Sequence, residues 1–379
     1  MCGVKVIGKT VVLLLICDVI GRCVIGASSE EVLLYRGTSD ASAAVAVGEA
    51  MFVVADDENN VLRVYKVSQT CLPVFSCDLT QFLDIEMEHA EADIEGATMI
   101  GERIYWITSH GRNRDGKMRP NRYRFFATAV KVQDQNITIS PVGTPCRTLI
   151  HSLIKTESMR RLQLDRATRF DATNLTEKER KSLAPKENGL NIEALCASAD
   201  GKIIYIGFRN PRPYSKALVV PLNNPKQVIE KKQPPIFAAP LLWDLKGYGI
   251  RSIEYSYFHK VYFIIVGAHD EKPGFALYRW SGDKDSQPVR VQGQTRMPFC
   301  AIGESGEKDF DKYNFTPEAL ITFKACDKFL LLSDDGSLPV DVSDPSECMQ
   351  GKLHKNGTCL NKYLTDPNEK HFRAVWLRP

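Results

Sequence analysis

The sequence has little excess charge of either sign, and it has no long apolar segment beyond its N-terminus. Lysine and arginine number 49 against 46 aspartate and glutamate residues, which gives a formal net charge of +3. So small an imbalance provides no global electrostatic argument for binding to nucleic acid or to a membrane surface. No later segment has the ~20 apolar residues that a membrane span requires. The chain is 44% hydrophobic and 25% charged, which is typical of a folded globular protein.

Sequence motifs of several common enzyme classes are also absent. The chain contains no G-x-S-x-G nucleophile elbow, no H-E-x-x-H pair and no G-x-x-x-x-G-K-[ST] phosphate loop. The cysteine spacing does not match a zinc site. The basic stretch GRNRDGKMRPNRYRFFA indicates a solvated loop or a rim that attracts anions, rather than a nucleic-acid surface. The sequence shows no complete set of catalytic residues, so the repeated sequence pattern described below is the main guide to function.

The N-terminal residues 1–27 have the pattern of a secretory signal peptide. Two lysines in MCGVKVIGK precede the short apolar run TVVLLLICDVI, and small residues that end at Ala27 offer a cleavage site. A membrane anchor is the alternative, but the apolar run is shorter than a span. We therefore expect a secreted or periplasmic protein, monomeric and without a membrane span after cleavage.

Eight cysteines remain after residue 27, and an even number agrees with disulfides in an oxidising compartment. Cys348 and Cys359 bracket a polar loop and are the first expected pair, and Cys71 with Cys77 is the second. Unpaired buried thiols are the alternative for these cysteines. Four N-x-[ST] sequons could carry glycans in a eukaryote but have no such meaning in a bacterium; they lie at Asn136, Asn174, Asn314 and Asn356.

One pattern recurs five times along the chain. A short strand with alternating apolar residues is followed by a polar turn and by a strongly apolar strand that ends in charged residues. The copies read DASAAVAVGEAMFVVADDE from Asp40, DIEGATMIGERIYWITSHG from Asp93, NIEALCASADGKIIYIGFR from Asn191, RSIEYSYFHKVYFIIVGAH from Arg251 and TPEALITFKACDKFLLLSDDG from Thr316. The pattern predicts five β-hairpins.

The spacing of these hairpins predicts an all-β protein, a β-propeller with five recognised blades in one domain over residues 30–379. A four-stranded blade takes roughly 40–50 residues, and alignment on one acidic position gives steps of 53, 98, 61 and 64 residues. The longest step favours a helical insertion over residues 146–188, with a degenerate sixth blade as the alternative. Pairing of Glu31–Tyr35 with Phe372–Leu377 would close the ring. A β-sandwich is the second choice, but it does not explain hairpins at blade-like spacing.

The segments DASAAVAV, FVVADDE, EADIEGA, SHGRN, RPNRYRFFAT, NIEAL, GFRNPRP, GIRSIE and SDDG resemble a domain-of-unknown-function family that occurs mainly in bacterial genomes. The resemblance covers roughly residues 31 to 379. It implies an exported, propeller-like protein without an established activity. The DIEGA and NIEAL segments also resemble, more distantly, the phytase-like esterase propellers. That likeness implies a link to calcium and to phosphoester chemistry, although fold likeness does not carry function.

Residues that recur at one place in each blade form a ring about the propeller axis. Alignment on the acid places five residues in this ring: Ser42, Glu95, Glu193, Glu254 and Glu318. Crowded carboxylates repel, so they must be protonated, paired with arginine or bound to a cation, and Ca²⁺ suits a set of oxygen ligands. The alternative is structural, with each glutamate capping a strand or pairing with an arginine between blades.

Two functions remain open. One is a binding protein that holds a small anionic ligand, a glycan or a protein at a channel mouth lined by carboxylates and arginines. The other is a metal-dependent hydrolase of phosphoesters or other esters. Its metal ligands would be Glu95, Glu193, Glu254, Glu318 and Asp334. His110 or Asp93 would then move protons, and Arg112, Arg209 and Arg251 would bind the substrate.

Overall fold

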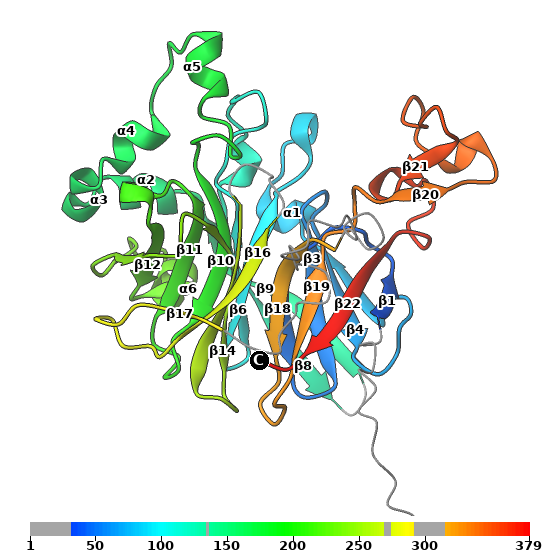
Figure 1. Cartoon of the computed structure of the whole chain (residues 1–379), viewed down its shortest axis with the longest axis horizontal. Helices are drawn as coiled ribbons and strands as arrows, with labels where there is room; N and C mark the ends of the chain where they lie inside the picture. Colours follow the sequence, from blue (N-terminus) through cyan, green and yellow to red (C-terminus); the bar gives the residue numbers. More distant parts are fainter. Residues whose placement is uncertain (1–31, 134–135, 269–273, 292–314) are drawn as a thin grey trace, which may run out of the picture. The chain divides into compact units, whose positions relative to one another are not determined.

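Each of the five predicted hairpins extends into a four-stranded antiparallel sheet, or blade. The computed structural model describes residues 32–133, 136–268, 274–291 and 315–379, which lie in one unit that runs from Glu31 to Pro379. The innermost strand of each blade lies beside that of the next blade, and β18 lies beside β2, so the five blades close a ring (Figure 1). This architecture confirms the prediction of a five-bladed β-propeller and excludes the β-sandwich.

The first four blades follow one another along the chain, each from its innermost strand outward. Blade one contains β2 (Ala41–Val47), β3 (Met51–Asp56), β4 (Val61–Lys66) and β5 (Phe75–Asp78). Blade two contains β6 (Ile94–Ile100), β7 (Arg103–Thr108), β8 (Phe125–Gln133) and β9 (Asn136–Cys146). Blade three contains β10 (Asn191–Ala197), β11 (Ile204–Asn210), β12 (Ala217–Leu222) and β13 (Leu241–Trp243). Blade four contains β14 (Gly249–Ser256), β15 (Val261–Gly267), β16 (Phe275–Trp280) and β17 (Val289–Arg290).

Blade five combines strands from both ends of the described chain. Its strands, from the axis outward, are β18 (Pro317–Thr322), β19 (Phe329–Ser333), β22 (His371–Leu377) and β1 (Val32–Arg36). Tyr35 is opposite Phe372, and the two rings stack with their centroids 5.3 Å apart. The predicted pairing of the terminal strands is confirmed, and it leaves no inner strand of the ring unpaired.

The core consists of apolar side chains packed between neighbouring blades. The second strands are buried on both faces because each is covered by a blade on either side, and β3, β11 and β19 are buried throughout. Large aromatic residues fill the wider, outer part of these interfaces. Trp243 and Trp280, for example, lie between blades three and four with ring centroids 5.0 Å apart. Burial of this apolar area is the main force that holds the ring together.

The helices are short and lie in the connections. They are α1 (Thr80–Leu83), α2 (Leu149–Ile154), α3 (Glu157–Arg161), α4 (Leu164–Thr168), α5 (Glu177–Lys181) and α6 (Pro225–Lys231). Single-turn 3₁₀ helices occur at Met87–His89, Pro120–Arg122, Pro213–Ser215, Pro345–Glu347 and Asn361–Tyr363.

Four of these helices, α2 to α5, form the predicted insertion between blades two and three. Apolar residues of α2 pack into the core between those blades, and α5 begins with a capping box of Thr176 and Glu179. The alternative of a sixth blade is therefore wrong for this segment. No helix in the described part of the chain is both long and apolar enough to cross a membrane.

A second insertion leaves blade five after β19. It contains the two-stranded hairpin β20 (Pro339–Asp341) and β21 (Thr358–Leu360). The predicted disulfide between Cys348 and Cys359 joins this insertion, and its small apolar cluster includes Leu364. Covalent closure supports a segment that has too little apolar surface to form a core of its own.

The predicted pairing of Cys71 with Cys77 is wrong, since both thiols are free. Strand β5 carries Cys77 along β4, opposite Leu62, whereas the carbonyl of Cys71 accepts a hydrogen bond from the backbone N–H of Arg36. Asn136, Asn174 and Asn356 are exposed. Several predictions concern residues outside the described ranges: the signal peptide at 1–27, Cys300 and the sequon at Asn314.

Most long connections of the described chain gather at one end of the propeller, although the connection from β12 to β13, which contains α6, lies at the other end. In every blade the innermost strand begins where the second strand ends, as Asn191 opposite Asn210 shows for blade three. Connections into innermost strands and out of second strands therefore share this end, whereas tight turns join the two strands at the other. Helix α1, helix α5 and the β20–β21 hairpin all lie in the upper half of Figure 1. We refer to this end as the loop end.

Candidate functional site

A β-bulge interrupts the first hairpin of every blade at the same place. The two residues that flank the bulge in the innermost strand pair with consecutive residues of the second strand, so one residue between them stays unpaired. We call these five residues the bulge ring: Ser42, Glu95, Glu193, Arg251 and Glu318. Bulges re-aim side chains, and here they bring residues of different blades together, since Arg251 contacts both Glu193 and Glu318.

Blade four corrects the alignment that was based on the sequence. Ile250 pairs with Val266 and Ser252 with Ile265, so Arg251 has the bulge position. Glu254 lies three residues further along β14, opposite Phe263. The alignment failed because it matched residue types: the strings IEGA and IEYS are similar, but they occupy different registers. The predicted ring of acids is therefore wrong at blade four, where a guanidinium replaces the carboxylate.

Two further rings flank the bulge ring towards the loop end. The entrance ring consists of the residues two positions before each bulge: Asp40, Asp93, Asn191, Gly249 and Thr316. The exit ring consists of the residue that follows, in each second strand, the partner of the residue just before the bulge: Asp57, Ser109, Arg209, Gly267 and Asp334. Contacts between rings show that they meet, because Ser109 Oγ donates to Asp93 Oδ2 and Arg209 donates to Glu193 Oε1 at 2.8 Å.

Blades one and two supply the acid-rich half of this site. One ligand oxygen from each of Asp57, Asp93 and Glu95 lies within 4.8 Å of the other two, and the same holds for Asp40, Asp56 and Asp57. Asp93 Oδ2 lies 3.0 Å from a guanidinium nitrogen of Arg122. Within the described residues, Asp57 Oδ1 is buried and accepts no hydrogen bond. This half therefore has more carboxylate oxygens than hydrogen-bond donors to satisfy them.

Burial and mutual repulsion raise the pKa values of these carboxyls. The pKa of Asp57 is raised well above its usual value by burial, with Asp40 and Glu95 adding to the shift. Burial raises the pKa of Glu95 in the same way, followed by the charges of Asp93 and Glu193. The pKa of Asp40 is also raised well above its usual value, by burial and then by Asp334. At neutral pH the acid-rich half must hold protons or a cation.

Blades three to five supply a second half in which arginines neutralise the glutamates. Glu193 Oε1 accepts from Arg209 at 2.8 Å, and Glu193 Oε2 lies 3.3 Å from Arg251. Arg251 also forms an ion pair with Glu318. Burial raises the pKa of Glu318 to about 7, against the lowering effect of Arg251. Both arginines are thus engaged by glutamates, and this limits their availability to an anionic ligand.

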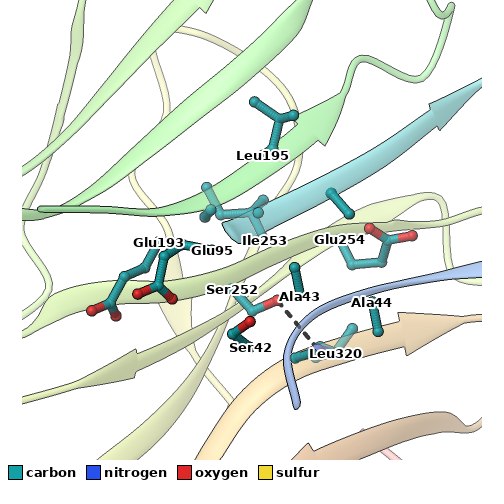
Figure 2. A pocket seen from close by; sticks show the side chains of 14 residues that line it. Ser42, Ala43, Ala44, Glu95, Glu193, Leu195, Ser252, Ile253, Glu254 and Leu320 are labelled. Carbon is teal, nitrogen blue, oxygen red and sulfur yellow. Dashed lines mark hydrogen bonds between the residues drawn. The ribbon is translucent and has the colours of Figure 1, made fainter. Parts of the chain in front are cut away.

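A narrow pocket follows the axis between the innermost strands, with about 230 Å³ of empty volume, part of which is open to solvent. Figure 2 shows the carboxylates of Glu95 and Glu193 side by side at one end of this pocket, and Glu254 at the other end. Ser252, whose Oγ accepts from the backbone N–H of Leu320 at 3.2 Å, lies between them. Glu254 is therefore separate from the acid-rich half, although it lines the same pocket.

His110 and Arg112 lie in none of the three rings. His110 is fully buried, with Nδ1 2.8 Å from the carbonyl oxygen of Thr108, and burial lowers its pKa to about 4. Its neighbour Ser109 donates to Asp93, whereas the ring of His110, which has a left-handed backbone (φ 52°), packs edge-on against Tyr123. Arg112 donates to the carbonyl oxygens of Gly116 and Arg169, and it thereby ties two connections together. Their placement supports structural roles, in contrast to the predicted proton transfer and substrate binding.

The other predicted residues come together at the loop end, namely Asp93, Glu95, Glu193, Arg209, Arg251, Glu318 and Asp334. His269, which the sequence places at the exit of blade four, is outside the described residues. The sequence alone places Asp57 at the polar end of the first hairpin, but it predicts no metal-binding or catalytic role for Asp40, Asp57 or Arg122. The pair Asp56-Asp57 at the end of the first copy was a usable signal, because it falls where the other copies carry polar residues.

Comparison with solved structures gives distant likenesses only. The alignment with the β-propeller domain of Cps50 (Swd1) from Myceliophteria thermophila covers 92% of this chain and 99% of that domain, with 8% identity and a TM-score of 0.34. It aligns with Kuenenia stuttgartiensis hydrazine synthase at 9% identity and a TM-score of 0.35, over 82% of this chain and 60% of that one. Sqt1 from Chaetomium thermophilum, bound to the N-terminus of ribosomal protein L10, aligns at 14% identity and a TM-score of 0.29, over 65% of this chain. The chain spans about half of the length of that Sqt1, since 47% is covered.

No curated protein matches the sequence. A family model does, over residues 40–334, which run from the first residue of the entrance ring to the last residue of the exit ring. The matched region therefore includes all three rings and every bulge. The chain belongs to the family described as "Protein of unknown function (DUF3616)".

Proposed function

We propose that the loop end of the propeller binds a divalent cation, with Ca²⁺ as the first candidate, and that a ligand or partner binds there through this ion. The observation that supports this proposal is an excess of negative charge in the three rings. The three rings contain seven carboxylates, namely Asp40, Asp57, Asp93, Glu95, Glu193, Glu318 and Asp334. Among the described residues, three guanidiniums form ion pairs with these carboxylates, those of Arg122, Arg209 and Arg251. Lys362 lies close enough to affect the site, but it pairs with Glu58.

The geometry of the acid-rich half fits such an ion. Ca²⁺ takes oxygen ligands at 2.3–2.6 Å, so two ligands of one ion lie at most about 5 Å apart. Both groups of carboxylates around Asp57 meet that limit. Asp57 would hold the ion together with Asp93 and Glu95 or together with Asp40 and Asp56, and protein-bound water would complete its coordination. An anionic ligand would then bind to the ion rather than to the arginines, which the glutamates already engage.

We also propose that the protein acts outside the cytoplasm. The disulfide between Cys348 and Cys359 favours an oxidising compartment, as does the signal-like pattern of residues 1–27. Extracellular Ca²⁺ sites commonly bind with dissociation constants of about 10⁻⁴–10⁻³ M. Cell fractionation of the native host would check this location: recovery of the full-length chain in the cytoplasm would contradict it.

The first test is calorimetric titration of Ca²⁺ into the folded wild type and into Asp57→Asn. We expect binding by the wild type and an affinity at least ~10-fold weaker in the variant, which corresponds to about 1.4 kcal/mol. Glu254→Gln is the matched control, since Glu254 lines the same pocket but lies apart from the acid-rich half; it should bind like the wild type. Absence of binding to Ca²⁺, Mg²⁺ and Mn²⁺ would refute the proposal, as would wild-type affinity in Asp57→Asn.

Hydrolysis of phosphoesters is a second candidate function, and one observation favours it. Asp57 belongs to both carboxylate groups, so it could bridge two ions, and pairs of metal ions stabilise both the attacking and the leaving oxygen in phosphoryl transfer. Glu95, beside these two ions, would accept a proton from a bound water. A screen of phosphomonoesters and phosphodiesters with Ca²⁺, Mg²⁺ or Mn²⁺ tests this function. Turnover that survives Asp57→Asn would assign the activity elsewhere.

A further inference from the structure

Blade four differs from the other four blades in all three rings. It contributes Gly249 to the entrance ring, Arg251 to the bulge ring and Gly267 to the exit ring. Every other blade contributes a side chain with an oxygen or nitrogen atom at each of these positions. Blade four therefore contributes a single polar side chain to the three rings, that of Arg251, because its other two positions are glycines.

The two glycines make room for the arginines. A Cβ atom at Gly267 would lie 3.1 Å from Arg251 Nε and 2.9 Å from Phe275 Cε1. A Cβ atom at Gly249 would lie 2.6 Å from the backbone oxygen of Arg209 and 2.9 Å from its Cγ. Arg251 also stacks on Phe275, with Cζ 5.7 Å from the ring centroid, a favourable cation–π arrangement. The packing thus fixes both guanidiniums in place.

The fixed guanidiniums neutralise Glu193 of blade three and Glu318 of blade five. Arg251 contacts Glu193 and Glu318, and Arg209 contacts Glu193 on its other oxygen. This network of ion pairs contains two positive and two negative groups, so its formal charge is zero. In contrast, the opposite half, around Asp57 and Glu95, contains the carboxylates that lack such partners within the described residues.

We infer that Arg251 determines where the site accepts a cation: its guanidinium acts as a built-in counter-ion for Glu193 and Glu318 and confines the exchangeable ion to blades one and two. In this form the inference rests on the proposed function. It has a consequence that a purely structural role of Arg251 does not have. Among the described residues, removal of its charge leaves Glu318 without a guanidinium partner and Glu193 with Arg209 alone, and these two acids, beside Glu95, then form a further cation site.

The experiment compares the number of Ca²⁺ ions bound per chain by wild type, Arg251→Met and Arg251→Lys, measured by calorimetry and by equilibrium dialysis. We expect one additional ion in Arg251→Met and wild-type stoichiometry in Arg251→Lys, which restores the charge. Thermal unfolding with and without Ca²⁺ gives a second measurement, in which Ca²⁺ should raise the Tm of Arg251→Met by more than that of the wild type. Arg112→Met is the matched control, because Arg112 is buried and, within the described ranges, its guanidinium donates to backbone oxygens and pairs with no carboxylate.

The outcomes separate this inference from the proposed function. If Arg251→Met is folded and binds as many ions as the wild type, the inference is overturned. If the wild type binds no ion but Arg251→Met binds one, the proposed function falls, whereas the role of Arg251 as a counter-ion is upheld. If Arg251→Met does not fold without Ca²⁺, the same comparison is made with Arg209→Met, which leaves Glu193 with Arg251 as its one guanidinium partner among the described residues and should also gain Ca²⁺ binding; wild-type stoichiometry there would overturn the inference.

Discussion

Replacement of Glu254 by glutamine should stabilise the protein at alkaline pH. Glu254 lies on β14 at the end of the axial pocket away from Glu95 (Figure 2). Burial raises its pKa from about 4.5 to about 8, although a hydrogen bond with Thr322 acts in the opposite direction. The carboxyl is therefore protonated in the folded chain at neutral pH, whereas the same group in the unfolded chain is ionised.

The size of the effect follows from linkage. Between pH 4.5 and 8 the folded chain holds a proton that the unfolded chain has lost, so rising pH favours unfolding. Each unit of difference in pKa corresponds to about 1.4 kcal/mol, and the two pKa values therefore imply a loss of up to about 5 kcal/mol across this range. Glutamine has a similar shape, retains hydrogen-bonding atoms and does not titrate. The variant and the wild type should have similar stability near pH 4, and the variant should be several kcal/mol more stable near pH 8.

Chemical denaturation at a series of pH values from 4 to 9 measures this difference. Glu102→Gln provides the control, because Glu102 is an exposed carboxylate on the turn between β6 and β7; its profile should parallel that of the wild type. The reasoning would be refuted if the profiles of Glu254→Gln and wild type also ran parallel from pH 5 to pH 8. That result would mean that the carboxyl of Glu254 ionises in the folded chain as readily as in water.

Two further predictions concern packing and covalent closure. Gly267→Ala should lower the free energy of unfolding by about 1–3 kcal/mol, measured by denaturant titration, because the added Cβ would lie within 3.1 Å of both Phe275 and Arg251; unchanged stability would show that these side chains have room to move. Cys348→Ser opens a short loop and should cost about 3 kcal/mol within the β20–β21 insertion. Limited proteolysis should then cut that insertion between Cys348 and Cys359 while the blades remain intact, and wild-type resistance would contradict this role of the disulfide.

Much of the fold could be predicted from the sequence because its causes are local. Alternating apolar residues and polar turns define each hairpin, and the blade-like spacing of the copies indicates a ring. The terminal strands were identifiable from the need to pair exposed edges. The disulfide between Cys348 and Cys359 followed from a short polar loop with a cysteine at each end.

The site could be predicted only in part because its chemistry depends on contacts between blades. A bulge shifts the pairing register without any mark in residue type, so Glu254 was taken for the ring residue that is in fact Arg251. The partners of Arg251 are Glu193 and Glu318, which are distant in sequence. Sequence patterns showed that acids and arginines gather at one end, but not which of them neutralise one another.

The pairing of β1 with β22 has a consequence for the synthesis of the chain. Arg36 is opposite His371, so the first described strand has no partner until more than 300 further residues have been made. A ribosome produces about 5–20 residues per second, and β1 therefore waits at least ~15 seconds for its partner while blades one to four are made. During this interval the edge of β1 can pair with other nascent chains, as can the edge of β19 in the shorter time between its own synthesis and that of β22. Newly made copies of this protein should therefore depend on chaperones until their last strand emerges.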